Sequence, residues 1–112
     1  MTSSTFTIED AQRQEMVRQI SLMAILSISG GRVTPIPDGI ELPVSNGYRV
    51  RVQLTPIDDY TVTRVFIRGG KEFEHGKRVH VYADEVSAAA YYAGMFRSYD
   101  AHQWPLKSME GL

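Results

Sequence analysis

The stretch that decides the fold is Tyr48-Arg-Val-Arg-Val-Gln-Leu-Thr-Pro-Ile-Asp-Asp-Tyr-Thr-Val-Thr-Arg-Val-Phe-Ile67. On both sides of its centre, Pro56–Asp59, apolar and polar side chains alternate, which is the pattern of two half-buried strands. Proline and aspartate at the centre are typical of a turn, because proline presets its backbone angle and aspartate bonds to nearby N–H groups. The stretch therefore predicts an antiparallel hairpin.

The two faces of this hairpin follow from the length of its turn. A four-residue turn pairs Thr55 with Tyr60 and places Val50 opposite Val65, whereas another length exchanges the faces of one strand. The expected core-facing residues are Tyr48, Val50, Val52, Leu54, Val65 and Ile67. The expected outer face carries Arg49, Arg51, Arg64, Phe66 and Arg68, joined by Arg78 and Tyr82 from a third strand.

The N-terminal part of the chain predicts one long helix from Thr7 to Ser29. Thr7 is expected to cap its N-terminus, and the acidic Glu9 and Asp10 follow where the helix dipole favours negative charge. Gly30-Gly31 is expected to end the helix, because a residue without Cβ adopts the left-handed cap conformation readily.

The second half of this helix is more apolar than a helix lying on one sheet requires. Apolar side chains cover nearly the whole circumference over residues 22–28, whereas a surface helix needs one apolar stripe. Packing against a second helix would cover part of this surface, and association between copies of the chain would cover it more fully. The expected oligomer interface consists of Leu22, Ile25 and Leu26.

The remaining elements complete an α+β prediction. Residues 32–44 contain three prolines, which limits them to an edge strand or an extended arm, because proline cannot donate to a sheet ladder. Ser45-Asn46-Gly47 predicts a turn, Arg78–Tyr82 a third strand, and Glu85 to Tyr99 a second helix. We therefore expect a three-stranded antiparallel meander with both helices on its core-facing side.

Length and composition define the class of protein. A chain of 112 residues with an apolar share of 43% is expected to form a single domain, residues 1–112, with residues 1–6 and 101–112 as tails. Trp104 in the second tail is a candidate anchor.

The absence of cysteine excludes disulfides and thiolate metal sites and fits a reducing cytoplasm. The longest apolar run is far below the roughly 20 residues of a membrane span.

Catalytic and cofactor motifs are missing from the sequence. The three histidines show no metal-ligand spacing and adjoin no nucleophile. Asp58-Asp59 is expected to be a turn rather than a magnesium site. Gly69-Gly70-Lys71 lacks the spacing and the hydroxyl residue of a phosphate-binding loop. We therefore expect no enzyme, no cofactor and no bound metal.

The expected outer sheet face leaves a second function open. Aromatic and arginine side chains interleave on it, as on surfaces that stack bases and contact phosphates of single-stranded nucleic acid. Opposed arginines at positions 51 and 64 would also repel one another unless an anion lay between them. The alternative is a solvated or covered face, and the net charge of −1 favours it.

Residues 47–100 resemble a family of small uncharacterised proteins in phages of mycobacteria and related actinobacteria. The resemblance lies in Tyr48–Pro56, Tyr60–Lys71 and Val81–Glu85, and in the segments Ala90–Ala93 and Phe96–Tyr99. It implies a non-virion accessory protein in the host cytoplasm, where some members inhibit host growth. Together with the missing catalytic chemistry, it leads us to expect a host-protein-binding function, with homo-oligomers, and with nucleic-acid binding as the alternative.

Overall fold

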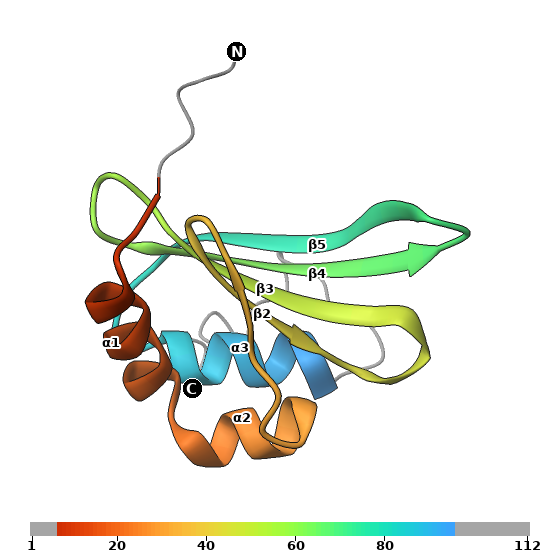
Figure 1. The fold of residues 1–112 in the computed structure, drawn as a ribbon, viewed down its shortest axis with the longest axis horizontal. Coiled ribbons are helices and arrows are strands. Elements are labelled where there is room, and N and C mark those ends of the chain that lie inside the picture. The colour runs from red at the N-terminus through yellow and green to blue at the C-terminus, as the bar shows by residue number, and fades with distance from the viewer. Residues whose placement is uncertain (1–6, 96–112) are drawn as a thin grey trace, which may run out of the picture.

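A computed structural model describes residues 7–95 of the chain, and of Met95 the backbone only. Its helices are α1 (Asp10–Ile20), α2 (Leu22–Ser29) and α3 (Val86–Met95). Its strands are β1 (Thr34–Ile36), β2 (Gly39–Pro43), β3 (Tyr48–Leu54), β4 (Tyr60–Arg68) and β5 (Lys71–Val81). The strands form one antiparallel sheet in the order β1-β2-β3-β4-β5 (Figure 1).

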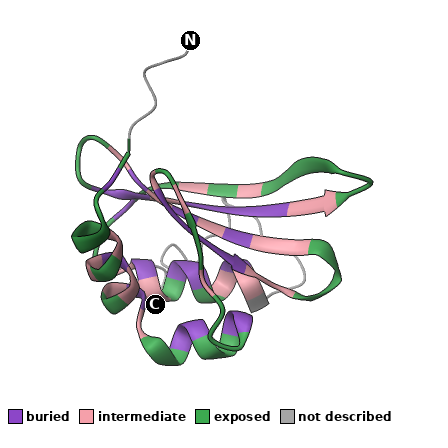
Figure 2. Ribbon diagram, in the orientation of Figure 1, coloured by how far each residue is buried: buried purple, intermediate pink, exposed green. Residues whose placement is uncertain are grey.

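The three helices lie on the same side of the sheet (Figure 1). Helix α3 packs on the central strands β3 and β4, and α1 and α2 pack against α3 and β2. Buried residues fill the space between the two layers, and the side of α2 that points away from the sheet is exposed (Figure 2). The largest fully buried side chains are Met16, Ile20, Ile25, Ile40, Leu42, Val50, Val52, Val62, Val81 and Val86.

The N-terminal helix is broken where a single helix was expected. Ser21 has φ 90° and its side chain accepts a hydrogen bond from the Ala24 N–H, so it ends α1 and caps α2. Helix α1 begins at Asp10 with Glu9 as its cap, rather than at Thr7. The predicted end is confirmed, since Gly30 adopts the left-handed conformation after Ser29.

The proline-containing segment forms two strands rather than one edge element. Strand β2 pairs with β1 on one side and with β3 on the other, which makes it an interior strand. Pro35 lies in the edge strand β1, Pro37 in the turn and Pro43 at the end of β2, positions where a missing N–H interrupts little of the ladder. The sheet therefore has five strands where three were expected.

The register between β3 and β4 differs from the predicted one by one residue. Leu54 pairs with Tyr60, so that Val50 faces Arg64 and not Val65. The cause is the turn, in which Asp58 takes a left-handed conformation (φ 70°) and donates its N–H to the Thr55 carbonyl. Five residues therefore lie between the last paired residues of the two strands, instead of the expected four.

The change of register exchanges the two faces of β4. Arg64 and Phe66 lie on the helix side, because their partners in β3 are Val50 and Tyr48. Val65, predicted to line the core, lies on the outer face opposite Arg49. Of the core positions predicted in β3, Val50, Val52 and Leu54 are buried in the core, whereas Tyr48 is only partly buried.

Strand β5 is longer than predicted and forms the second edge of the sheet. It follows a two-residue turn, Gly69-Gly70, in which both residues have positive φ. Its pairing with β4 shifts register twice, and each shift leaves an extra residue in β5. Gly76 and His80, both with positive φ, lie within these two irregular segments.

Candidate functional site

Helix α2 exposes a row of large apolar side chains. Its eight residues include no charged side chain. Leu22 is 67% exposed, Met23 73% and Leu26 47%. Ile25, predicted to belong to the interface, is instead 2% exposed and part of the core. Of the predicted interface, Leu22 and Leu26 are on the surface.

A groove of about 470 Å³ runs between α2 and α3 beside these side chains. Small side chains line much of it, and Met23 and Tyr91 lie along it. Tyr91 is 39% exposed, and Ser21 and Ser87 approach each other across the helices at 3.5 Å between their Oγ atoms. We call this area, with Leu22, Met23, Leu26, Tyr91 and the groove, the α2–α3 surface.

The outer face of the sheet carries an ionic network. Arg51 donates to Glu41 Oε2 from Nε at 2.9 Å and from Nη2 at 2.6 Å, and Nη2 lies 3.2 Å from Glu72 Oε2. Arg49 is 3.7 Å from Glu41, so β2, β3 and β5 are linked across this face. The charged residues that the strand pairing places here are Glu41, Arg49, Arg51, Glu72, Glu74 and Lys77.

This network is electrically balanced. Its three cations and three carboxylates cancel, and each of the six takes part in an ion pair, including Lys77 with Glu74 at 3.3 Å. Desolvation alone would lower the pKa of Arg51, but hydrogen bonds to Glu41 and Glu72 and the charges of those carboxylates raise it overall. A phosphate at Arg51 would have to displace carboxylates that already neutralise it.

The other members of the predicted basic face lie elsewhere. Pairing places Arg64, Phe66, Arg68 and Arg78 on the helix side of the sheet, and Tyr82 follows the end of β5. Arg64 is 7% exposed and lies over the Tyr48 ring, 4.4 Å from its centroid. Tyr48 also contacts Phe66 and His75, with ring centroids 4.9 Å and 5.6 Å apart. The predicted continuous arginine face is therefore wrong.

A buried carboxylate holds one of the histidines. Asp59 is 4% exposed, accepts a hydrogen bond from the Thr55 hydroxyl at 2.6 Å, and lies 2.9 Å from His80 Nδ1. Hydrogen bonds from Thr55 and then from His80 lower the pKa of Asp59. The contact joins the β3–β4 turn to β5 at His80, whose backbone is left-handed (φ 57°).

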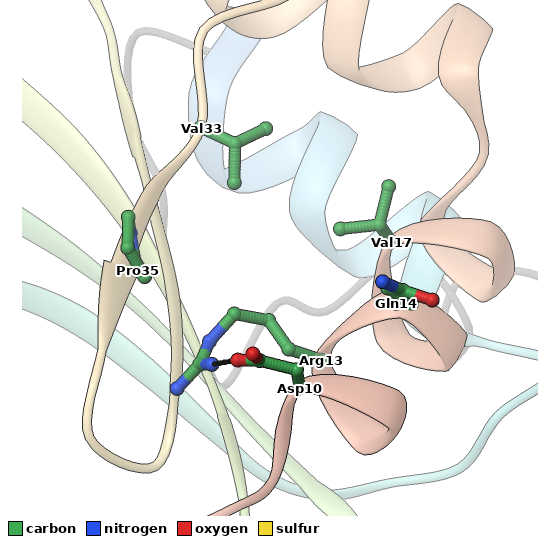
Figure 3. Close-up of a pocket in the computed structure, with 6 residues that line it drawn as sticks. All are labelled: Asp10, Arg13, Gln14, Val17, Val33 and Pro35. Atoms are coloured by element: carbon green, nitrogen blue, oxygen red, sulfur yellow. Dashed lines mark hydrogen bonds and ion pairs between the residues drawn. The ribbon is translucent and has the colours of Figure 1, made fainter.

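A second groove, of about 380 Å³, lies between α1 and β1 (Figure 3). Val17, Val33 and Pro35 form its apolar walls. Arg13 reaches across one end and donates to the carbonyls of Ile36 at 2.8 Å and Gly39 at 3.1 Å. Its third contact is with Asp10 at 3.0 Å, so this arginine is fully engaged in joining α1 to the β1–β2 hairpin.

Sequence reasoning missed several of these residues. Tyr91 joins the α2–α3 surface only through the packing of two helices that are far apart in the chain. Met23 carried a usable signal, because it belongs to the apolar segment that no single stripe accommodates. Trp104, the predicted tail anchor, lies outside the described residues.

Among residues 7–95, no three histidine or acidic side chains gather in a group suited to a metal ion. Within that same range, no helix has the combined length and apolarity needed to cross a membrane. Comparison of the chain with protein-family models, with curated proteins and with solved structures found no match.

Proposed function

We propose that this protein is not an enzyme and acts by binding another protein through the α2–α3 surface. The observation that carries the proposal is the exposure of Leu22, Met23 and Leu26 on a helix without a single charge. Exposed apolar side chains gathered in one place mark interaction sites, whereas isolated ones are ordinary. The adjacent groove offers a recess for apolar side chains of a partner.

The balance of charge on the sheet supports a protein partner over nucleic acid. Single-stranded nucleic acid is held by uncompensated cations and by exposed rings on one surface. Here Arg51 is bound by two carboxylates, and Arg64 and Phe66 lie on the opposite face from it. Arg49 and Arg51, on the outer face, thus share no surface with the Tyr48 and Phe66 rings, which lie on the helix side.

The resemblance to actinobacteriophage proteins provides the cellular context of the proposal. In that context the chain is an accessory protein in the host cytoplasm, its partner is a host protein, and copies of the chain associate with one another. The mode of action requires neither a cofactor nor a bound metal.

Affinity capture from an actinobacterial host lysate tests the proposal. The wild type is compared with Leu26→Glu and with Ile57→Glu, and each is used with and without nuclease. Ile57 is the matched control, because it is 70% exposed in the β3–β4 turn and is not part of the α2–α3 surface. We expect a nuclease-resistant protein that binds wild type and Ile57→Glu and is lost with Leu26→Glu.

Two results would overturn the proposal. Equal capture by all three forms would place the contact outside the α2–α3 surface. Loss of every captured protein after nuclease treatment would instead favour the nucleic-acid function. Circular dichroism of each variant establishes that the fold is retained, which we expect because both substituted side chains are on the surface.

A further inference from the structure

The α2–α3 surface combines a protruding part and a recessed part. Met23 protrudes from α2, with 73% of its surface exposed. Beside it, the groove is lined by small side chains, including Ala24, Ser27 and Ala88. A long, flexible methionine fits an irregular recess well. The same surface therefore supplies both an apolar knob and a hollow of about 470 Å³ that could receive one.

The charges of this surface also suit a partner identical to itself. In a two-fold interface the same patch occurs on both subunits, so a charge near the axis meets its own copy and is repelled. The segment from Ser21 to Gly31 carries no charged residue. Of the residues that line the groove, Asp84 alone is charged, and it is exposed. Self-association would therefore bring few like charges together.

The apolar area is of the size that one side of such an interface requires. From their exposed fractions, Leu22, Met23, Leu26 and Tyr91 together present on the order of 400 Å². A standard interface covers about 800 Å² on each partner, of which roughly 450 Å² is apolar. The four side chains thus account for nearly the whole apolar part of one side.

We propose that a second copy of this chain docks on the α2–α3 surface and forms a two-fold dimer. Met23 of each subunit enters the groove of the other, and Leu22 and Leu26 pack around the axis. This inference rests on the proposed function and names one partner of the same surface. A host protein that binds the α2–α3 surface would then compete with the second subunit.

The first test is the mass of the protein in solution. Light scattering at high micromolar concentration should give twice the chain mass of 12.6 kDa for wild type and for Ile57→Glu. Met23→Glu should weaken the dimer at least about a hundredfold, because each dimer would bury two unpaired carboxylates. A monomeric wild type, or a Met23→Glu protein that remains dimeric, overturns the inference.

The second test locates the contact and uses the absence of cysteine from the chain. Met23→Cys and Ala88→Cys proteins, carrying tags of different size, are mixed and oxidised. The dimer predicts a cross-linked species that contains both tags, because Met23 of one subunit meets the groove of the other. Ile57→Cys replaces Ala88→Cys in the control mixture and should give none. Equal cross-linking in the two mixtures overturns the proposed geometry.

These outcomes separate the dimer from the proposed function. A monomeric wild type that still captures a host protein through Leu26 rejects the second copy and keeps the protein-binding function. A dimer that captures no host protein keeps the second copy and rejects the host partner.

Discussion

Replacement of Arg13 by alanine should loosen the N-terminal helix from the sheet. The guanidinium donates to two main-chain carbonyls of the β1–β2 hairpin, at Ile36 and Gly39, and its side chain is 18% exposed. A hydrogen bond from a charged donor contributes about 1.5–3 kcal/mol, and water can partly replace it at carbonyls near the surface. We expect Arg13→Ala to lower the free energy of unfolding by about 2–3 kcal/mol.

The third contact of Arg13 contributes little to this figure. Asp10 is 93% exposed, so its ion pair with Arg13 is worth less than about 0.5 kcal/mol. The stem of Arg13 also lines one end of the groove that Val17 and Val33 line (Figure 3), so its removal adds to the loss in the alanine variant. Lysine at position 13 would keep the charge but lose the fork that reaches two carbonyls, so it should recover less than half of the stability.

Arg18→Ala provides the matched control on the same helix. Arg18 is 77% exposed and pairs with Glu15 at 2.9 Å, so its removal should cost less than about 0.5 kcal/mol. Urea denaturation followed by circular dichroism, at one protein concentration, measures both variants. An Arg13→Ala protein as stable as Arg18→Ala would refute the view that this side chain joins α1 to the hairpin.

Three further predictions concern the sheet. Gly39→Ala should lower the free energy of unfolding by about 3 kcal/mol, because the alanine Cβ would lie 1.9 Å from the Val52 carbonyl oxygen. Gly69→Ala is the control: its Cβ would meet open space, and only the left-handed backbone at φ 59° would cost about 1–2 kcal/mol. Thermal unfolding measures both variants. In the folded protein the pKa of Asp59 is lowered below its unfolded value near 3.9. The ionised carboxylate therefore stabilises the fold fully above that unfolded pKa, and this stabilisation is lost as the pH falls through the folded pKa. The melting temperature of wild type should thus drop below about pH 4, and that of Asp59→Asn should drop less. Fluorescence anisotropy at about 50 mM salt should detect no oligonucleotide binding, since the Arg51 network is neutral, and tight binding would contradict that assignment.

The sequence was sufficient for the α+β class, the antiparallel pairing and the end of the second helical segment at Gly30. These features depend on local patterns, such as alternation in β3 and β4 and the special backbone freedom of glycine. The register was not accessible in the same way. It depends on whether Asp58 adopts a left-handed conformation, which aspartate tolerates but does not require.

The break at Ser21 escaped prediction for a similar reason. A serine with φ 90° gives no glycine or proline signal, and the two apolar segments around it read as one helix. The change of apolar pattern at this position was nevertheless visible, and in the structure Ile25 and Ile28 are buried while Leu22, Met23 and Leu26 are exposed. Tertiary contacts such as Arg13 with the hairpin join residues 23 and 26 positions apart, which no local pattern reveals.

The two irregular segments of β5 have a consequence for the way copies of this protein meet. The unpaired N–H and C=O groups of an edge strand can hydrogen-bond to strands of other molecules. Such pairing can continue without limit and lead to fibres or precipitates. Strand β5 is long and exposed, but register shifts at two places and the turned backbone of Gly76 and His80 interrupt its outer row of hydrogen-bonding groups. Pro35 limits the opposite edge in the same way. With both edges unsuited to growth, the proposed two-fold contact through the helices would close on itself after two subunits.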